Sequence, residues 1–318
     1  MIDLAPVQKA LLTAIGSSER PSESRFAARL ARNPELLALR FRRAERILRL
    51  VGGEGRALLD AGSGIALNAV LSILAGASEV HAVELNPHRL EVARRLVAEL
   101  GLGARVHLLD QDILTFELPP GSLGGMYSNE FLEHIVDSPE YHRRAARWLA
   151  PGGRVYGRTG ANGGNWLYHY TYSRKWQRAE RGVYQPARRN ALRALLPEAP
   201  AETLEKLARA TRGHGPAELA EAARAWKNEG RWPQPLGRVP KNPETGVYYE
   251  RLRGPRELVA EMAAAGLRAR VIRPDYRNAF TPSKLKRLAL HLAGAALAAT
   301  HPVSLCVAPW LEVLGEKP

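Results

Sequence analysis

Strand and helix patterns alternate from about residue 56 to residue 158, and this alternation constrains the possible fold more than any other feature. Short apolar runs with strand character alternate with longer segments at helical spacing, and glycine or proline residues separate many of them. The expected strands are 56–60, 79–84, 105–109, 123–128 and 154–158, and the expected helices are 65–75, 87–100 and 130–149. Such alternation is typical of right-handed βαβ units, so we expect an α/β fold with a mostly parallel sheet.

The chain outside this core divides into three further parts. Residues 1–50 have helical spacing throughout. Residues 161–245 carry no strand pattern and hold expected helices at about 187–197, 201–212 and 216–228. The sheet pattern then resumes with a helix at 255–265 and strands at 268–273 and 311–315. We therefore predict an N-terminal helical segment (1–50), a core (51–160), a helical cap inserted for substrate (161–245) and a C-terminal part of the sheet (246–318).

Two features of the core point to a nucleoside-binding site. The loop after the first expected strand contains Asp60, Gly62 and Gly64 and opens a helix, where glycines permit a tight turn and close approach of a ligand. Glu84 ends the next strand, 22 residues after Gly62, where a carboxylate can accept hydrogen bonds from ribose hydroxyls. A dinucleotide site requires a third glycine at the position of Leu67, so a bound pyrophosphate is disfavoured.

This pattern resembles the class I S-adenosylmethionine-dependent methyltransferases, whose loop typically reads D-x-G-x-G-x-G. Ala66 stands here at the last glycine. The segments 110–113, 127–135 and 149–155 also resemble family motifs in the same order, so the resemblance covers about residues 55–160. Within the superfamily the core looks like that of the ubiquinone-biosynthesis O-methyltransferases. The resemblance implies a Rossmann-like, mostly parallel sheet of seven strands, with the cap as an insertion.

The resemblance also implies S-adenosylmethionine as cofactor, with S-adenosylhomocysteine as product. The glycine loop would hold the methionyl part, Glu84 the ribose diol, and Asp112 the adenine amino group. The cofactor-binding residues that it implies are Asp60, Gly62, Gly64, Glu84, Leu85, Asp112, Ile113 and Asn129.

Two histidines are candidate catalytic bases, His134 and His169, because an imidazole exchanges protons near neutral pH. Glu130, Glu133 and His134 form E-x-x-E-H, which on a helix would place three ligand atoms on one face. This resembles metal-dependent methyltransferases, in which a divalent ion would activate the acceptor oxygen. The prediction is nevertheless no metal, because an acid and a histidine here also serve the helix start and the cofactor pocket in enzymes without a metal.

An aromatic run follows the fifth expected strand, where ligands bind in open α/β sheets. We take Asn165, Trp166, Tyr168 and Tyr170 as candidate substrate-binding residues. Tyr168, Tyr170 and Tyr172 alternate along the chain, which predicts three rings on one face of an extended segment. The alternative is that the aromatic side chains form the core of the cap itself.

The basic residues comprise 38 Arg and 8 Lys, and the formal net charge is +14. Such a surface suits phosphate, carboxylate or anionic lipid, although a host that favours arginine codons gives the same composition. Cys306 is the only cysteine, which excludes an internal disulfide. The N-terminus has no secretory pattern, and the longest apolar stretch near the C-terminus, 288–299, is too short to span a bilayer. We expect a soluble cytoplasmic protein, at most peripheral to the inner membrane surface through a basic amphipathic helix at about 283–299 that contains Lys284, Lys286 and Arg287.

These observations predict a methyltransferase that acts by in-line displacement on the oxygen of a small or medium-sized biosynthetic acceptor. The expected acceptor is a partly apolar molecule of the natural-product type. An oxygen acceptor is favoured because it requires a base or a metal, and His134 with its neighbouring acids is available. The alternatives are a lipid-linked or glycan acceptor at a membrane surface, an RNA acceptor, and a non-catalytic partner subunit. The identity of the acceptor depends on the cap, which carries no readable motif.

Overall fold

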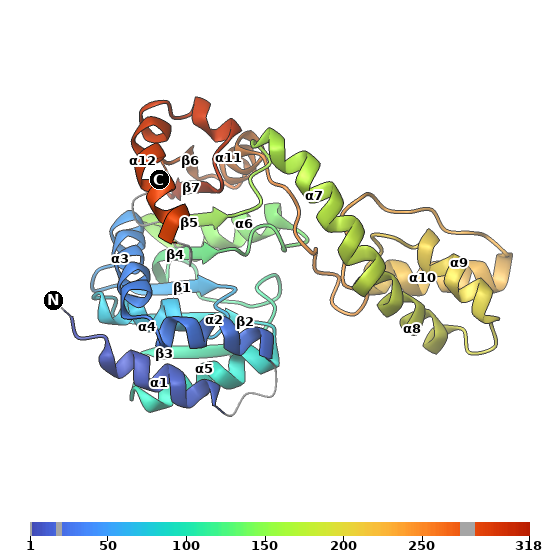
Figure 1. Cartoon of the computed structure of the whole chain (residues 1–318), viewed down its shortest axis with the longest axis horizontal. Helices are drawn as coiled ribbons and strands as arrows, with labels where there is room; N and C mark the ends of the chain where they lie inside the picture. The colour runs from blue at the N-terminus through green and yellow to red at the C-terminus, as the bar shows by residue number, and fades with distance from the viewer. Residues whose placement is uncertain (1, 17–20, 274–283) are drawn as a thin grey trace.

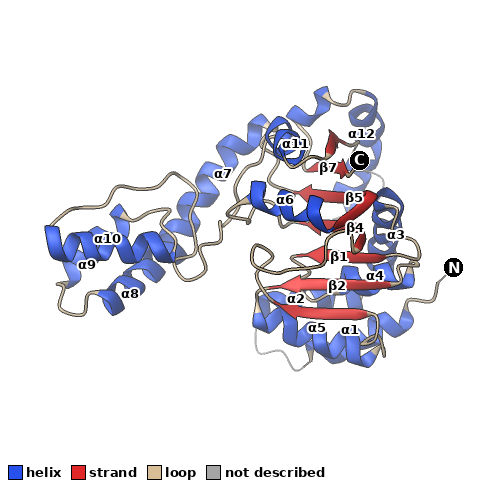
Figure 2. Cartoon of the chain, turned by 180° about the vertical axis from the view of Figure 1, so that it is seen from behind, coloured by secondary structure: helices blue, strands red, loops and turns tan. Residues whose placement is uncertain are grey.

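The computed structural model describes residues 2–16, 21–273 and 284–318 and contains a sheet of seven strands (Figures 1 and 2). The strand order is β3-β2-β1-β4-β5-β7-β6. The first five strands pair in parallel, whereas β7 runs antiparallel to both β5 and β6. The strands are β1 (Ala57–Ala61), β2 (Glu79–Glu84), β3 (Val106–Asp110), β4 (Leu123–Asn129), β5 (Leu149–Thr159), β6 (Arg268–Val271) and β7 (Leu311–Glu316). The predicted seven-stranded, mostly parallel sheet is confirmed.

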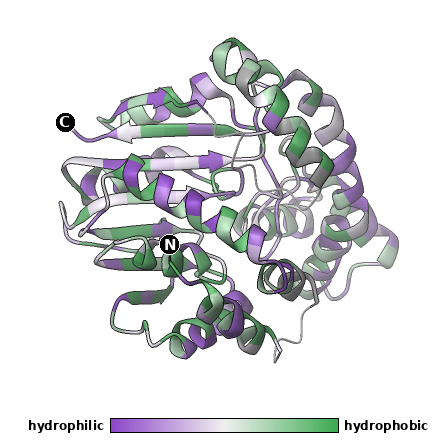
Figure 3. Ribbon diagram, turned by 60° about the vertical axis from the view of Figure 1, so that its left-hand side comes forward, coloured by the Kyte–Doolittle hydropathy of each residue, from purple (hydrophilic) through white to green (hydrophobic). Residues whose placement is uncertain are grey.

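Helices cover both faces of this sheet (Figure 2). One apolar core lies between the sheet and the helices α1 to α5, and a second lies between the sheet and α6 and α11. Figure 3 shows hydrophobic and hydrophilic residues interleaved along the helices, as expected where one side of a helix packs on the sheet and the other faces water. The helices are α1 (Ala5–Ile15), α2 (Pro21–Ala31), α3 (Pro34–Val51), α4 (Leu67–Leu74), α5 (Pro87–Glu99), α6 (Ser138–Trp148), α11 (Pro255–Ala264) and α12 (Lys284–Ala299).

The predicted helix at 130–149 is wrong over its first eight positions. Glu130 has a φ of +54°, which a right-handed helix does not allow, and α6 begins only at Ser138. Asp137 caps α6 by accepting a hydrogen bond from the Glu140 amide at 2.9 Å, with a proline in the first turn. Residues 130–137 therefore form a loop at the end of β4.

The insertion after β5 forms a helical arm that extends away from the sheet, on the side where the parallel strands end (Figures 1 and 2). Its elements are α7 (Trp166–Ala179), the π-helical turn η1 (Glu180–Tyr184), α8 (Gln185–Leu195), α9 (Ala201–Ala210) and α10 (Pro216–Glu229). Leucines of α8, α9 and α10 form a separate small core. Within it Arg188 is fully buried, donates to the Ala208 carbonyl at 3.0 Å and pairs with Glu180. The three predicted helices are confirmed, while the domain boundaries remain predictions.

The C-terminal helix α12 carries exposed leucines at 285, 288 and 292, which lie on one helical face. The side chains of Lys284, Lys286 and Arg287 lie outside the described residues. Across the described parts of the chain, no helix is long and apolar enough to cross a membrane. Membrane contact through α12 therefore stays a prediction.

Candidate active site

The glycine loop between β1 and α4 lies at the end of β1. Gly62 and Gly64 have φ values of +68° and +60°, which favour glycine. A Cβ atom on Gly62 would lie 2.4 Å from the Phe131 side chain, whereas a Cβ atom on Gly64 would have no neighbour within 4 Å. Gly62 thus allows the loop after β4 to pack closely, and Gly64 borders open space that a ligand can enter.

Glu84 ties the ends of β1 and β2 together through its carboxylate. Its Oε2 accepts a hydrogen bond from the Gly64 amide at 2.8 Å. Its Oε1 accepts from the amides of Leu85 at 3.0 Å and Asn86 at 2.9 Å. The carboxylate is buried, yet it lies directly beside the open side of Gly64. Gly64 and Glu84, which are 20 positions apart in the sequence, are therefore in contact, while the Leu85 side chain is exposed.

Asp60 is the buried acid of the site. Its Oδ2 has no hydrogen-bond partner among the described residues. Burial raises the pKa of the Asp60 carboxyl well above its usual range, while the guanidinium of Arg40 opposes this shift and the charge of Glu84 reinforces it. A cationic or hydrogen-donating ligand group at Oδ2 would relieve this desolvation.

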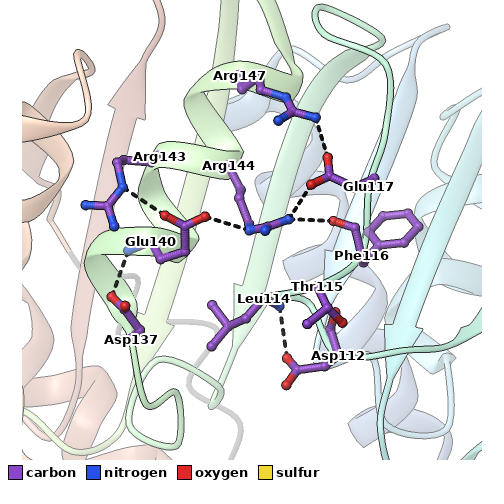
Figure 4. A network of polar contacts seen from close by, with 10 residues as sticks. All are labelled: Asp112, Leu114, Thr115, Phe116, Glu117, Asp137, Glu140, Arg143, Arg144 and Arg147. Carbon is purple, nitrogen blue, oxygen red and sulfur yellow. Dashed lines mark hydrogen bonds and ion pairs between the residues drawn. The ribbon is translucent and has the colours of Figure 1, made fainter.

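Asp112 lies in the loop after β3, with an exposed side chain. Its Oδ1 accepts a hydrogen bond from the Leu114 amide at 2.9 Å (Figure 4). Ile113 is buried in the second core. The loop is held to α6 because Arg144 donates to the Phe116 carbonyl at 2.8 Å. The predicted contact of Asp112 and Ile113 with an adenine ring stays a prediction.

Asn129 ends β4 and lies opposite Arg158 of β5 in the sheet register. Its Oδ1 accepts from Nη2 of Arg43, a residue of α3, at 2.7 Å. Its Nδ2 is buried without a hydrogen-bond partner in the described part of the chain. Asn129 is thus positioned by Arg43, which lies outside the residues predicted for the site.

The E-x-x-E-H residues do not share a helical face, since they lie in the loop 130–137. Glu130 pairs with Arg158 and accepts from the Gly160 amide at 2.8 Å. Glu133 is buried instead, and burial raises the pKa of its carboxyl to about 7. Among the described residues, no group of three His, Cys, Asp or Glu side chains is arranged to hold a metal ion.

His134 has a defined orientation. Its Nδ1 lies 2.9 Å from the Tyr248 carbonyl oxygen, and its own carbonyl accepts from the Tyr248 amide at 3.1 Å. Because a carbonyl only accepts, Nδ1 must carry the hydrogen, and in the neutral ring the lone pair lies on Nε2. His134 is therefore held as a proton acceptor through Nε2.

The aromatic run after β5 is helical, so the predicted extended face with three rings is wrong. On α7, Tyr168 and Tyr172 are four residues apart, and the centroids of their rings are 5.3 Å apart. The exposed Tyr170 packs against Arg174 instead. The Tyr168 hydroxyl donates to the Pro309 carbonyl at 2.9 Å. Alternation along the chain does not bring side chains together on a helix.

The other predicted residues of this region lie at the start of α7. Asn165 is buried and caps the helix, because its Oδ1 accepts from the Leu167 amide at 3.0 Å and its Nδ2 donates to the Ala308 carbonyl at 3.0 Å. His169 is exposed, with Nε2 at 2.9 Å from the Gly163 carbonyl oxygen, and Trp166 is 63% exposed. Their roles in substrate binding stay predictions.

Residues 59–157 match the family described as a methyltransferase domain. Over 101 residues the chain is 30% identical to methyltransferase phqN of Penicillium fellutanum. The aligned segment covers 32% of this chain and 31% of that protein. The chain is 31% identical to phosphoethanolamine N-methyltransferase 1 of Arabidopsis thaliana over 101 residues, or 32% of this chain and 20% of that one.

Among solved structures, an S-adenosylmethionine-dependent methyltransferase from Mesorhizobium loti is 19% identical, with a TM-score of 0.49 over 89% of this chain and 100% of that chain. The match to a methyltransferase domain thus lies within the part of the chain that forms the central strands of the sheet. The alignments span less than a third of the length of these two curated relatives.

Proposed function

We propose that this protein transfers the methyl group of S-adenosylmethionine to an oxygen atom of a small or medium-sized acceptor. The observation that supports cofactor binding is the contact between the buried Glu84 carboxylate and Gly64 at the ends of β1 and β2, and the orientation of His134 supports an oxygen acceptor. The Glu84 contact lies at the position at which a doubly wound α/β sheet binds a ribose.

The residues present fit the cofactor. The unpartnered Oδ2 of Asp60 suits the ammonium group of the methionyl part, and the open side of Gly64 allows that part to approach the backbone. Glu84 would accept hydrogen bonds from the ribose hydroxyls, and Asp112 from the adenine amino group. When bound, the cofactor supplies a methyl group on a sulfonium cation, which is already activated for displacement.

The contribution of the chain to chemistry is positioning and proton removal. A hydroxyl acceptor must lose its proton as the new bond forms, and Nε2 of His134 is the available acceptor on the loop after β4. Holding the acceptor oxygen in line with the methyl group supplies much of the remaining rate enhancement. Glu130 and Glu133, which take other partners or lie buried, would shape the loop that holds His134.

The test is a methyl-transfer assay with tritiated cofactor and paired acceptors that differ only in a hydroxyl or an amine. We expect label on the hydroxyl member of a pair, with and without a chelator of divalent metals. Transfer only to the amine member, or only with added metal, would contradict the proposed oxygen transfer by a histidine base.

A further inference from the structure

Four arginines, of which Arg43 is buried and the other three are half-buried, gather where the central strands end. Arg40, Arg43 and Arg46 recur at every third position of α3, and α3 packs against β4 and β5. Arg158 lies at the end of β5, opposite Asn129 of β4. These arginines thus approach the edge of the sheet at which an acceptor would lie beside the cofactor.

Arg43 carries a buried charge without a carboxylate partner. The residue is 9% exposed, and its Nη2 donates to the neutral amide oxygen of Asn129 at 2.7 Å. Arg43 makes no ion pair within residues 2–16, 21–273 and 284–318. A guanidinium removed from water in this way is strongly disfavoured unless an anion approaches it. The structure therefore holds a cation that lacks its counter-ion.

The neighbouring carboxylates are already engaged with other arginines. Glu312 lies 2.7 Å from Nη1 of Arg46, and Glu130 pairs with Arg158. The guanidinium of Arg158 also stacks 4.8 Å above the ring of Trp310, which orients it. Positive charge therefore exceeds negative charge around Asn129.

The pKa shifts of Arg40 and Arg158 agree with this excess of positive charge. Burial and the charge of Arg43 lower the pKa of Arg40 to about 9, although Asp60 opposes the shift. Burial and the same neighbour lower the pKa of Arg158. Both shifts describe a site in which an added anion would be favourable.

We propose that Arg43 and Arg158 bind a carboxylate or phosphate group of the methyl acceptor. The proposal rests on the proposed function, and it narrows the acceptor to an anionic molecule. Guanidinium groups suit such oxyanions because their N–H donors can bond two oxygens at once. The buried Nδ2 of Asn129, which has no partner among the described residues, supplies a further donor between them.

The test uses the full chain saturated with S-adenosylhomocysteine and titrated calorimetrically, at constant ionic strength, with inorganic pyrophosphate and separately with succinate. We expect at least one probe to bind with a submillimolar dissociation constant. Arg43→Gln and Arg158→Gln should each weaken that binding at least tenfold. Arg42→Gln is the matched control, because it removes the same charge from an exposed position of the same helix and should change binding less than twofold. Arg43→Lys keeps the positive charge and replaces Arg43→Gln in the experiment if that variant does not fold. It should weaken binding of the probe by threefold or more.

A second arm separates the acceptor from the carboxylate of the cofactor. The same variants are titrated with S-adenosylhomocysteine and with 5′-methylthioadenosine, which lacks the amino-acid part. If Arg43→Gln weakens the binding of S-adenosylhomocysteine but not that of 5′-methylthioadenosine, the arginines bind the carboxylate of the cofactor and the proposal is wrong. Absence of probe binding to the saturated wild type would also overturn it. Failure of the proposed function itself is a different result, because S-adenosylhomocysteine would then not bind the wild type at all.

Discussion

Replacing His134 by Asn should lower kcat by about 10² to 10⁴, the usual contribution of a general base. The asparagine amide nitrogen can take the place of Nδ1 and still donate to the Tyr248 carbonyl, so the loop stays anchored. What is lost is the lone pair on Nε2. We therefore expect the affinity for S-adenosylhomocysteine to change less than threefold while turnover falls.

The measurement is kcat for the wild type and the variant at saturating cofactor and acceptor. His88→Asn, an exposed histidine on α5, is the matched control. If His134→Asn keeps kcat within threefold of the wild type, the histidine is a structural residue and another group removes the proton.

Replacing Glu133 by Gln should stabilise the protein at alkaline pH. Burial raises the pKa of Glu133 from 4.5 to about 7, so the folded state favours the neutral acid. Below pH 4.5 the Glu133 carboxyl is protonated in both the folded and the unfolded state, so it does not lower the free energy of unfolding. As the pH rises from 4.5 to 7, the unfolded state ionises first and the free energy of unfolding falls; above pH 7 the full cost of about 3 kcal/mol is present.

Urea unfolding at pH 5 and pH 8 measures this difference. The free energy of unfolding of Glu133→Gln should exceed that of the wild type by about 3 kcal/mol at pH 8 and by less than about 1 kcal/mol at pH 5. Glu99→Gln, on the exposed side of α5, should show no pH-dependent gain, because its side chain stays in water in both states. A Glu133→Gln variant that is less stable than the wild type at pH 8 would mean that the carboxylate is ionised and satisfied in the fold.

The sheet could be predicted because local patterns encode it, while the cofactor residues stay predictions. Glycines at positive φ and an acid at the end of the next strand are constraints that the sequence displays directly, and Gly64 and Glu84 indeed meet. The late start of α6 was also visible, since Asp137 followed by Ser138 and Pro139 is a helix-start signal. The acids before it were instead assigned to the helix because their spacing suited one face.

Other parts of the site depend on tertiary packing. Alternating tyrosines suggested a strand after β5, whereas Asn165 caps a helix there. Arg43 was not distinguished from the many other arginines of the sequence, although it lies on the buried face of α3 together with Ala44 and Ile47. A charged residue in an apolar stripe is a signal that periodicity can find. The anchoring of His134 by Tyr248 joins segments 114 residues apart, and no local pattern encodes it.

Binding of S-adenosylhomocysteine tests the central claim most directly. Calorimetric titration should give micromolar affinity for the wild type, and Glu84→Ala should weaken it tenfold or more, because the variant removes the ribose acceptor and releases the Gly64 amide. Glu79→Ala, at the start of the same strand and partly exposed, should leave the affinity unchanged. No binding to the wild type, or equal binding to Glu84→Ala, would contradict the assignment of this site.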